Sequence, residues 1–93
     1  MTGPPWADAE RDSRATAAWI AGLYAHILEV GDVSADSDFF VLGGTSLLAM
    51  RLLDTIAETT GTRIPVRAFY HATRVSELAR EVDARLPDAT RGA

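Results

Sequence analysis

The sequence predicts a small all-α bundle of three longer helices plus one short helix, with a long ordered loop between the first and second helices. Apolar residues recur at helical spacing in three separate windows, and no window alternates apolar and polar residues as a half-buried strand does. The 93 residues leave room for one small core. We therefore expect one domain over residues 13–86, with a flexible N-terminal tail at 1–12 and a C-terminal tail at 87–93.

The first predicted helix begins at Ser13, a suitable N-cap residue, and ends between Leu28 and Gly31. Gly22 costs about 1 kcal/mol inside a helix, which suggests close packing against a neighbouring element at that position. The face predicted to be buried repeats at i, i+3, i+4 and i+7 and consists of Thr16, Trp19, Ile20, Leu23, Tyr24 and Ile27.

The connection from Gly31 to Thr45 is longer than the roughly 2–8 residues usual between bundle helices. It contains five apolar residues, each of which gains about 1.5–3 kcal/mol on full burial: Val33, Phe39, Phe40, Val41 and Leu42. We therefore expect Phe39 and Phe40 to pin the loop across the helical core and to set the position of the turn at Gly43-Gly44.

The second predicted helix runs from Ser46 to Thr59, and Gly61 is its stop signal. Leu47 and Met50 lie off the buried face and flank Ser46, which suggests a small partner-binding patch. A projection at 100° per residue gives the buried face as Leu48, Ala49, Leu52, Leu53, Ile56 and Ala57.

A short third helix is predicted over Val66 to His71, directly after Pro65. Thr73 is then expected to be the N-cap of a last helix that ends before Pro87. The apolar stripe of this last helix consists of Val75, Leu78, Ala79, Val82 and Leu86.

The charge distribution favours a protein partner over nucleic acid. The net charge is −4, and residues 15–50 contain no arginine or lysine but four acids, Glu29, Asp32, Asp36 and Asp38. Phosphate binding needs a basic patch, so no nucleic-acid partner is expected. The acidic stretch suits a basic protein surface, and a solvated loop without a partner fits it equally well.

No window approaches the roughly 18 apolar residues of a membrane span, and the N-terminus lacks the pattern of a signal peptide. We therefore expect a cytoplasmic protein with no membrane partner. The sequence contains no cysteine, which excludes a disulfide framework and thiolate metal sites.

Catalytic and metal sites find little support in the sequence. Ser46 resembles the start of a Gly-x-Ser-x-Gly hydrolase elbow, but Leu48 replaces the second glycine and no strand precedes it. The same turn lacks the lysine and glycine spacing of a phosphate-binding loop. Two distant histidines make a weak zinc site, and the loop aspartates lack the register of an EF-hand. We expect no catalytic residue and no metal, and a helix N-cap is the simplest role for Thr45 or Ser46.

Four segments nevertheless form a known pattern: Asp38-Phe39-Phe40, Leu42-Gly43-Gly44-Thr45-Ser46-Leu47, Ile64-Pro65 and Val75-Ser76-Glu77-Leu78-Ala79. In order and interval they resemble the peptidyl carrier, or thiolation, domains of nonribosomal peptide synthesis, in the acyl carrier protein-like superfamily. The resemblance extends over about residues 15–86.

The resemblance implies that Ser46 is the attachment site of 4′-phosphopantetheine, which comes from coenzyme A and is bound covalently. The implied site loop comprises Asp38, Phe39, Phe40, Leu42, Gly43, Gly44 and Thr45. In such a site, the two glycines keep side chains out of a modifying enzyme's way. The implied docking surface comprises Leu47, Met50, Arg51, Ala68 and Phe69.

The resemblance also implies a set of partners and a non-catalytic role. A phosphopantetheinyl transferase attaches the arm, an adenylation enzyme loads it with an acyl group as a thioester, and condensation, tailoring or thioesterase enzymes act on that group. The chain itself is expected to be a monomer that catalyses nothing.

The subfamily is less sharply defined by the sequence. Fatty acyl carriers typically have Asp at the position of Thr45 and a strongly acidic second helix, whereas this helix sets Arg51 against Asp54 and Glu58. The peptidyl class is favoured, with polyketide, aryl or fatty acyl carriers as alternatives and a non-carrier helical interaction module as a third class. Met1 and two short tails suggest a free-standing carrier, although an excised domain would look similar.

Overall fold

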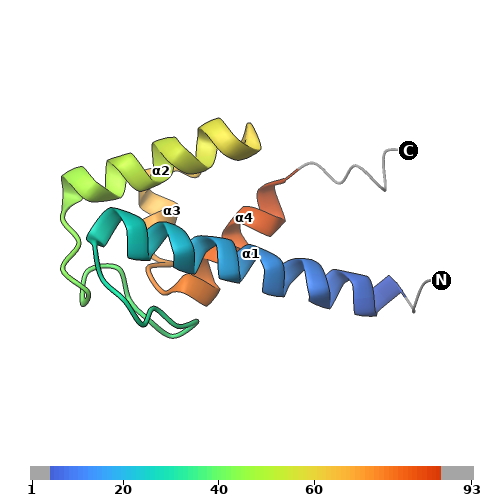
Figure 1. Cartoon of the computed structure of the whole chain (residues 1–93). Helices are drawn as coiled ribbons and strands as arrows, with labels where there is room; N and C mark the ends of the chain where they lie inside the picture. The colour runs from blue at the N-terminus through green and yellow to red at the C-terminus, as the bar shows by residue number, and fades with distance from the viewer. Residues whose placement is uncertain (1–4, 87–93) are drawn as a thin grey trace.

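The computed structural model describes residues 5–86, with side chains described from residue 14 onward. It contains four helices, α1 (Pro5–Leu28), α2 (Ser46–Thr60), α3 (Val66–Tyr70) and α4 (Val75–Arg85), and no strand among the residues described (Figure 1). The long helix α1 packs against both α2 and α4. The predicted all-α bundle is confirmed, and none of these helices is both long and apolar enough to span a membrane.

The first helix begins earlier than predicted. α1 starts at Pro5, so Ser13 lies inside the helix and is not its N-cap, and residues 5–12, which we assigned to a tail, are helical. Proline suits the first helical position, because its missing N–H has no intrahelical partner there. The segment also contains alanine, glutamate and arginine, which are good helix formers. Residues 1–4 and 87–93 of the predicted tails lie outside the described residues.

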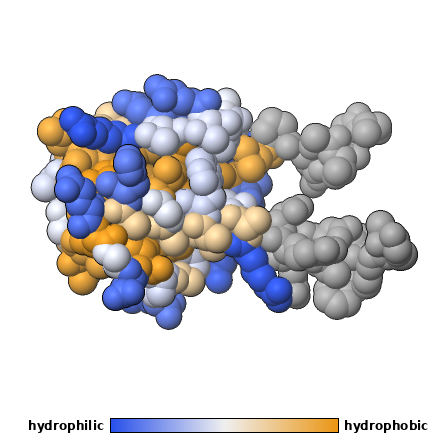
Figure 2. Space-filling model, in the orientation of Figure 1, coloured by the Kyte–Doolittle hydropathy of each residue, from blue (hydrophilic) through white to orange (hydrophobic). Residues whose placement is uncertain are grey.

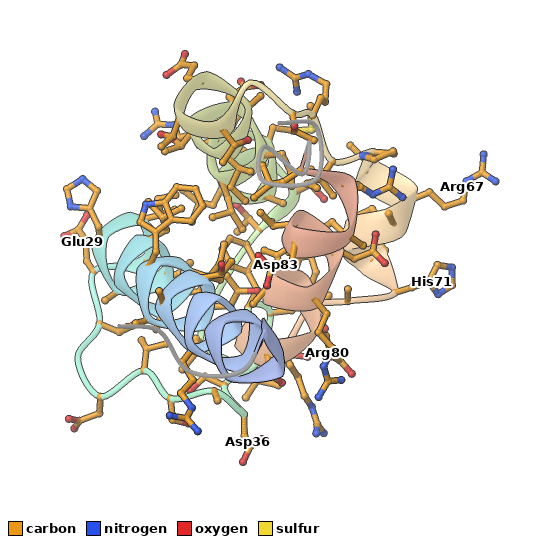
Figure 3. All side chains as sticks on the ribbon, turned by 90° about the vertical axis from the view of Figure 1, so that its right-hand side faces the viewer. Glu29, Asp36, Arg67, His71, Arg80 and Asp83 are labelled. Carbon is orange, nitrogen blue, oxygen red and sulfur yellow. The ribbon has the colours of Figure 1, made fainter. Side chains whose placement is uncertain are left out.

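The core lies between α1, α2 and α4 and is closed by the loop and α3. Of the predicted buried face of α2, Leu48 and Ala57 are only half-buried. At the edge of the core the hydroxyl of Thr16 donates a hydrogen bond to Asp83 Oδ1 at 2.8 Å, which joins α1 to α4. Figure 3 shows Asp83 between these two helices. The buried cluster consists of Ile20, Tyr24, Phe39, Ala49, Leu52, Leu53, Ile56, Ile64, Phe69, Val75, Leu78, Ala79 and Val82.

The loop between α1 and α2 crosses the start of α4 and satisfies its first amide groups. The N–H of Val75 donates to the carbonyl of Ser37 at 3.0 Å, and the N–H of Ser76 donates to the carbonyl of Ala35 at 2.9 Å. These amides have no acceptor within their own helix. The loop backbone therefore acts as part of the cap of α4, and the prediction of an ordered, pinned loop is confirmed.

The N-cap of α4 is Arg74 and not Thr73, as we predicted. The N–H of Arg74 donates to Glu77 Oε1 at 3.2 Å, the backbone half of a capping box. The hydroxyl of Thr73 donates instead to Asp38 Oδ2 at 2.6 Å, and its carbonyl accepts the N–H of Phe39 at 3.0 Å. Thr73 ties the loop to α4, so its hydroxyl does not cap the helix.

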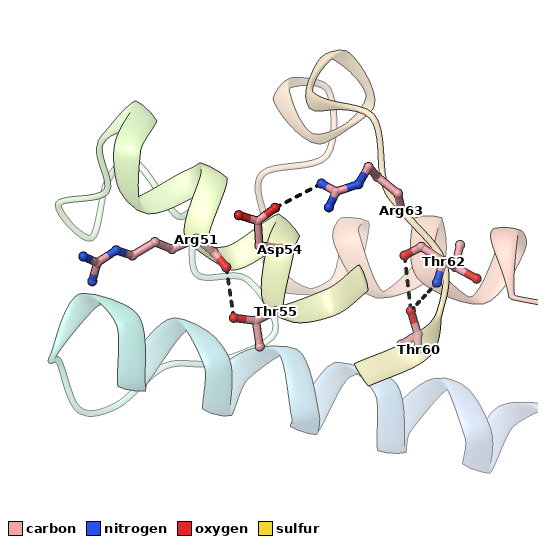
Figure 4. A network of polar contacts seen from close by, with 6 residues as sticks. All are labelled: Arg51, Asp54, Thr55, Thr60, Thr62 and Arg63. Atoms are coloured by element: carbon pink, nitrogen blue, oxygen red, sulfur yellow. Dashed lines mark hydrogen bonds and ion pairs between the residues drawn. The ribbon is translucent and has the colours of Figure 1, made fainter. Parts of the chain in front are cut away.

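The second and third helices end close to the predicted residues. α2 stops at Gly61, whose left-handed φ of 75° suits glycine. Beyond it, the N–H of Thr62 donates to Thr60 Oγ1 at 3.1 Å, and Arg63 pairs with Asp54 at 3.1 Å (Figure 4). These contacts turn the chain from α2 towards α3, although so exposed an ion pair contributes only about 0–1 kcal/mol.

Candidate functional site

Asp38 organises the turn that leads to Ser46. Its Oδ1 accepts the N–H of Phe40 at 2.9 Å and the N–H of Val41 at 3.2 Å, while its Oδ2 accepts the hydroxyl of Thr73 at 2.6 Å. One carboxylate thus closes the turn on its own segment and joins that turn to the residues before α4.

These contacts also set the ionisation of Asp38. Partial burial alone raises the pKa of its carboxyl group, but the hydrogen bonds from Thr73, Val41 and Phe40 and the charge of Arg74 outweigh that effect. The pKa of Asp38 is therefore lowered from its ordinary value. The charged form is the one that holds the turn together.

Tyr24 supports the same junction from inside the core. It is fully buried, and its hydroxyl donates to the carbonyl of Thr73 at 2.7 Å. Burial raises the pKa of Tyr24, and the carboxylates of Asp38 and Glu77 raise it further. Tyr24 is therefore a neutral hydrogen-bond donor at neutral pH.

The backbone geometry of the turn explains why glycine occupies positions 43 and 44. Gly43 has a φ of 107°, in the region that favours glycine. The N–H of Gly44 donates to the carbonyl of Phe39 at 2.9 Å. A Cβ atom on Gly44 would overlap the ring of Phe39 and lie 2.7 Å from its carbonyl oxygen. Glycine at position 44 therefore allows the buried phenylalanine and the turn to occupy neighbouring space.

Thr45 and Ser46 have different roles at the start of α2. Thr45 is the N-cap, and its Oγ1 accepts the N–H of Leu48 at 3.2 Å. Ser46 is the first helical residue and is exposed, with its Oγ 3.4 Å from the hydroxyl of Tyr70. Because Thr45 caps the helix, the Ser46 hydroxyl remains accessible to another molecule.

A cluster of aromatic rings connects this serine to the core. The ring of Phe39 packs edge-on against Phe69, with centroids 5.4 Å apart, and against Tyr24 at 5.1 Å. Phe40 stacks on Tyr70 at 5.7 Å with 21° between the ring planes. The predicted pinning by Phe39 and Phe40 is confirmed, with Phe39 fully buried and Phe40 half-buried.

The described part of the chain exposes four large apolar residues: Val41 in the turn before Ser46, Leu47 and Met50 at the start of α2, and Tyr70 beside Ser46. We call them the apolar rim. Their exposed fractions are 84%, 68%, 43% and 48% in that order. Figure 2 shows hydrophobic surface at the end of the molecule where α2 begins. The sequence indicated Leu47 and Met50 but not Tyr70, and it wrongly placed Val41 among the residues to be buried.

The other predicted docking residues divide between surface and interior. Arg51 is exposed, and its guanidinium extends away from the Asp54–Arg63 pair (Figure 4). Ala68 is half-buried. Phe69 is fully buried, so it cannot contact a partner directly, and this part of the prediction is wrong. Its neighbour Tyr70 presents the exposed ring.

A groove on the described surface is lined by Arg51 but not by Ser46. It lies between the end of α1 and α2, has a volume of about 570 Å³, and is lined mainly by charged and polar side chains, including His26, Glu29 and Asp54. Among the described residues, no three His, Cys, Asp or Glu side chains are grouped so that they could hold a metal ion. The chemistry of the site therefore centres on the exposed serine.

Residues 18–82 match the protein-family model described as the phosphopantetheine attachment site. The chain belongs to this family of carrier domains. The resemblance seen in the sequence is thereby confirmed, and the group that the family carries is 4′-phosphopantetheine.

The similar proteins are carriers or contain them. Over 63 residues the chain is 43% identical to the probable non-canonical nonribosomal peptide synthetase CymA of Salinispora arenicola, a match that covers 68% of this chain but 1% of that protein. BlmI, a type-II acyl carrier protein of Streptomyces verticillus involved in bleomycin biosynthesis, is 26% identical, with a TM-score of 0.77 and coverage of 87% of this chain and 96% of that one.

A second solved structure shows the same fold in a complex. It contains a peptidyl carrier protein with the phosphopantetheine transferase Sfp and coenzyme A. The match has 21% identity and a TM-score of 0.72, and it covers 75% of this chain and 91% of that one. At this identity the similarity shows the fold alone.

Replacing Gly44 with Ala should lower the free energy of unfolding by about 1–3 kcal/mol, the range for overpacking, because the new methyl group meets the ring and carbonyl of Phe39. Gly22→Ala is the matched control. A Cβ there meets nothing within 4 Å, so the close packing expected at Gly22 is absent, and alanine should stabilise α1 by about 0.5–1 kcal/mol. Urea unfolding of both variants measures the difference, and equal effects of the same sign would contradict the role of Gly44.

Replacing Asp38 with Asn should lower the free energy of unfolding at pH 7 by about 1.5–3 kcal/mol, the range for hydrogen bonds to a charged group. Because folding lowers the pKa of Asp38, its contribution is complete above the unfolded value of about 3.9 and disappears as the pH falls through the lower folded value. The difference between variant and wild type should therefore shrink below about pH 3.9.

Urea unfolding between pH 7 and pH 2 measures this dependence. Asp36→Asn is the control, because Asp36 belongs to the same loop, is exposed and extends away from the body of the molecule (Figure 3). A difference between Asp38→Asn and wild type that stays constant down to pH 2 would show that the charge of Asp38 does not stabilise the turn.

Proposed function

We propose that Ser46 is the attachment point of 4′-phosphopantetheine in this carrier domain. On that arm the chain holds an aminoacyl or related acyl group as a thioester for enzymes of nonribosomal peptide or hybrid natural-product biosynthesis. The main support is the exposed hydroxyl of Ser46, which lies inside the matched residues 18–82 and is not used as a helix cap.

The surroundings of Ser46 suit a phosphodiester. Thr45 caps the N–H of Leu48, and the other amides of the first turn point towards the helix start without intrahelical acceptors. The first turn of α2 contains no acidic residue. The positive end of the helix dipole therefore favours a phosphate group on the serine oxygen, with no carboxylate in that turn to oppose it.

The transfer changes one bond on this chain. The Ser46 oxygen bonds to the phosphorus nearest the pantetheine of coenzyme A, and the pyrophosphate bond at that phosphorus breaks. Adenosine 3′,5′-bisphosphate leaves, and the hydroxyl proton passes to a base on the transferase. When bound, the group supplies the thiol that accepts the acyl chain, because the sequence contains no cysteine.

The described residues do not form the arrangement of a serine hydrolase around Ser46. A nucleophilic serine needs an adjacent base, and among the described residues the group within hydrogen-bond distance of Ser46 Oγ is the hydroxyl of Tyr70. We therefore assign catalysis to the partner enzymes. The carrier raises the effective concentration of its tethered acyl group at their active sites.

The apolar rim and Arg51 form the docking surface in this proposal. Exposed apolar groups around one modification point are typical of a recognition site, and Glu29 and Asp36 add acidic charge on the loop side (Figure 3). The partners are a phosphopantetheinyl transferase, an adenylation enzyme and the condensation, tailoring or thioesterase enzymes that follow. Since the arm comes from coenzyme A, a cytoplasmic location belongs to the same proposal.

Incubation of the full chain with coenzyme A, magnesium and a broad-specificity phosphopantetheinyl transferase should add one phosphopantetheine to the intact mass. Ser46→Ala should show no addition, whereas Ser34→Ala, which removes an exposed serine in the loop before α2, should be modified fully. Circular dichroism checks that both variants fold. An unmodified wild-type chain, or a modified Ser46→Ala variant, would refute the attachment site.

Met50→Glu should slow loading of the modified chain by its adenylation enzyme at least several-fold, because the new charge must be desolvated in an apolar contact. Thr59→Glu is the matched control, since it adds the same charge at an exposed position near the other end of α2. The acyl-carrier mass is followed with time at limiting enzyme. Equal loading rates for the two variants would remove Met50 from the docking surface.

A further inference from the structure

Tyr70 brings a second hydroxyl group to the modification site. It is the last residue of α3, 24 positions after Ser46, and its hydroxyl oxygen lies 3.4 Å from Ser46 Oγ. Either oxygen can be the donor in the unmodified chain. This contact joins the end of α3 to the start of α2.

The position of the Tyr70 hydroxyl is determined by packed rings. The Tyr70 ring stacks on Phe40 at 5.7 Å and lies 6.1 Å from the ring of Phe69. Both of those rings pack against the fully buried Phe39. The ring is therefore held on one side by the core and open to solvent on the other, where 48% of the residue is exposed.

Packing alone does not explain the hydroxyl. The hydroxyl of the buried Tyr24 bonds the carbonyl of Thr73 and satisfies a polar group inside the core. The hydroxyl of Tyr70 bonds no backbone group in the described part of the chain, and a phenylalanine ring would stack on Phe40 equally well. What the hydroxyl adds is a polar group within hydrogen-bond distance of the serine oxygen.

Modification of Ser46 changes what this donor meets. The serine oxygen becomes an ester oxygen, which has no proton to donate, and the attached phosphodiester presents two oxygens that share one negative charge. Tyrosine can donate to either kind of oxygen, and a donor to an anionic oxygen forms a shorter and stronger hydrogen bond than one to a neutral oxygen.

Building on Ser46 as the attachment point, we propose that Tyr70 is a positioning residue whose hydroxyl donates a hydrogen bond to the phosphodiester. The bond holds the root of the arm against the end of α3. The first segment of the arm then leaves the protein beside the apolar rim, where a docked enzyme meets it, while the rest of the arm is free to move.

The test uses the full chain modified at Ser46, as wild type and as Tyr70→Phe, with ³¹P NMR at neutral pH. The reference is a short peptide of residues 43–47 that carries the same group. The wild-type ³¹P signal should be shifted from the peptide signal and broader than it, and the Tyr70→Phe signal should move towards the peptide position and sharpen. Thr59→Ala, which removes an exposed hydroxyl near the other end of α2, should keep the wild-type signal.

A second measurement does not depend on any variant. In the modified wild type, the ring protons of Tyr70 next to the hydroxyl should show a nuclear Overhauser effect to the pantetheine methylene beside the phosphate. Identical ³¹P signals in wild type and Tyr70→Phe, or the absence of this effect, would overturn the role of Tyr70. Failure of the transferase to add any mass to the wild type would instead overturn the attachment site.

Discussion

The junction between Asp38 and the residues before α4 is the constraint on which the rest of the site depends. Asp38 accepts two amides of its own turn and the hydroxyl of Thr73, and the backbone pairs Phe39 with Thr73 as well. These bonds satisfy polar groups that the crossing loop would otherwise bury without partners. The ring of Phe39 meanwhile contributes apolar burial at the centre of the bundle.

That junction gives a surface serine a defined position. A connection of this length loses much conformational entropy when it is ordered, and the burial of Phe39 and the cap it provides for α4 offset that loss. The backbone then turns at Gly43 and Gly44 directly over the buried ring. Ser46 is exposed, yet it lies only two residues after Gly44, whose backbone packs on the buried ring of Phe39.

The sequence predicted the helices and the loop because their signals are local. Apolar spacing predicted which faces of α1, α2 and α4 pack on the core, although Trp19, Leu23 and Ile27 of α1 are only partly buried. Gly61 marked the end of α2 as expected. The predicted start of α1 was wrong because the first residues of this helix have helical propensity without an apolar stripe. The prediction that Thr73 caps α4 was wrong for a different reason. The hydroxyl of Thr73 has a partner 35 residues away, and no local pattern encodes that contact.

The site was predicted only in part, because local sequence patterns do not encode its long-range contacts. The order of Gly44, Thr45 and Ser46 indicated a turn and a helix start, but Thr45 or Ser46 could equally have been the cap until the contact with Leu48 was seen. Phe69 and Tyr70 are adjacent aromatic residues in a helix of five residues. Which of them faces the core depends on where the loop places Phe39 and Phe40, and that is a property of the tertiary structure.

The same geometry separates stability from recognition. Asp38 accepts the N–H of Val41 while Phe39 is directed inward, so the turn that buries the phenylalanine also holds an apolar side chain in solvent. In α3 successive residues differ by about 100° around the axis, so burial of Phe69 leaves Tyr70 at the surface. Substitutions at Val41, Leu47 or Met50 change the exposed rim and remove little buried area. Substitutions at Phe39 or Phe69 remove core contacts and also release the rings that position the rim. Partner preference in this fold can therefore vary at the rim with little effect on folding, whereas a change in the core beneath it alters both.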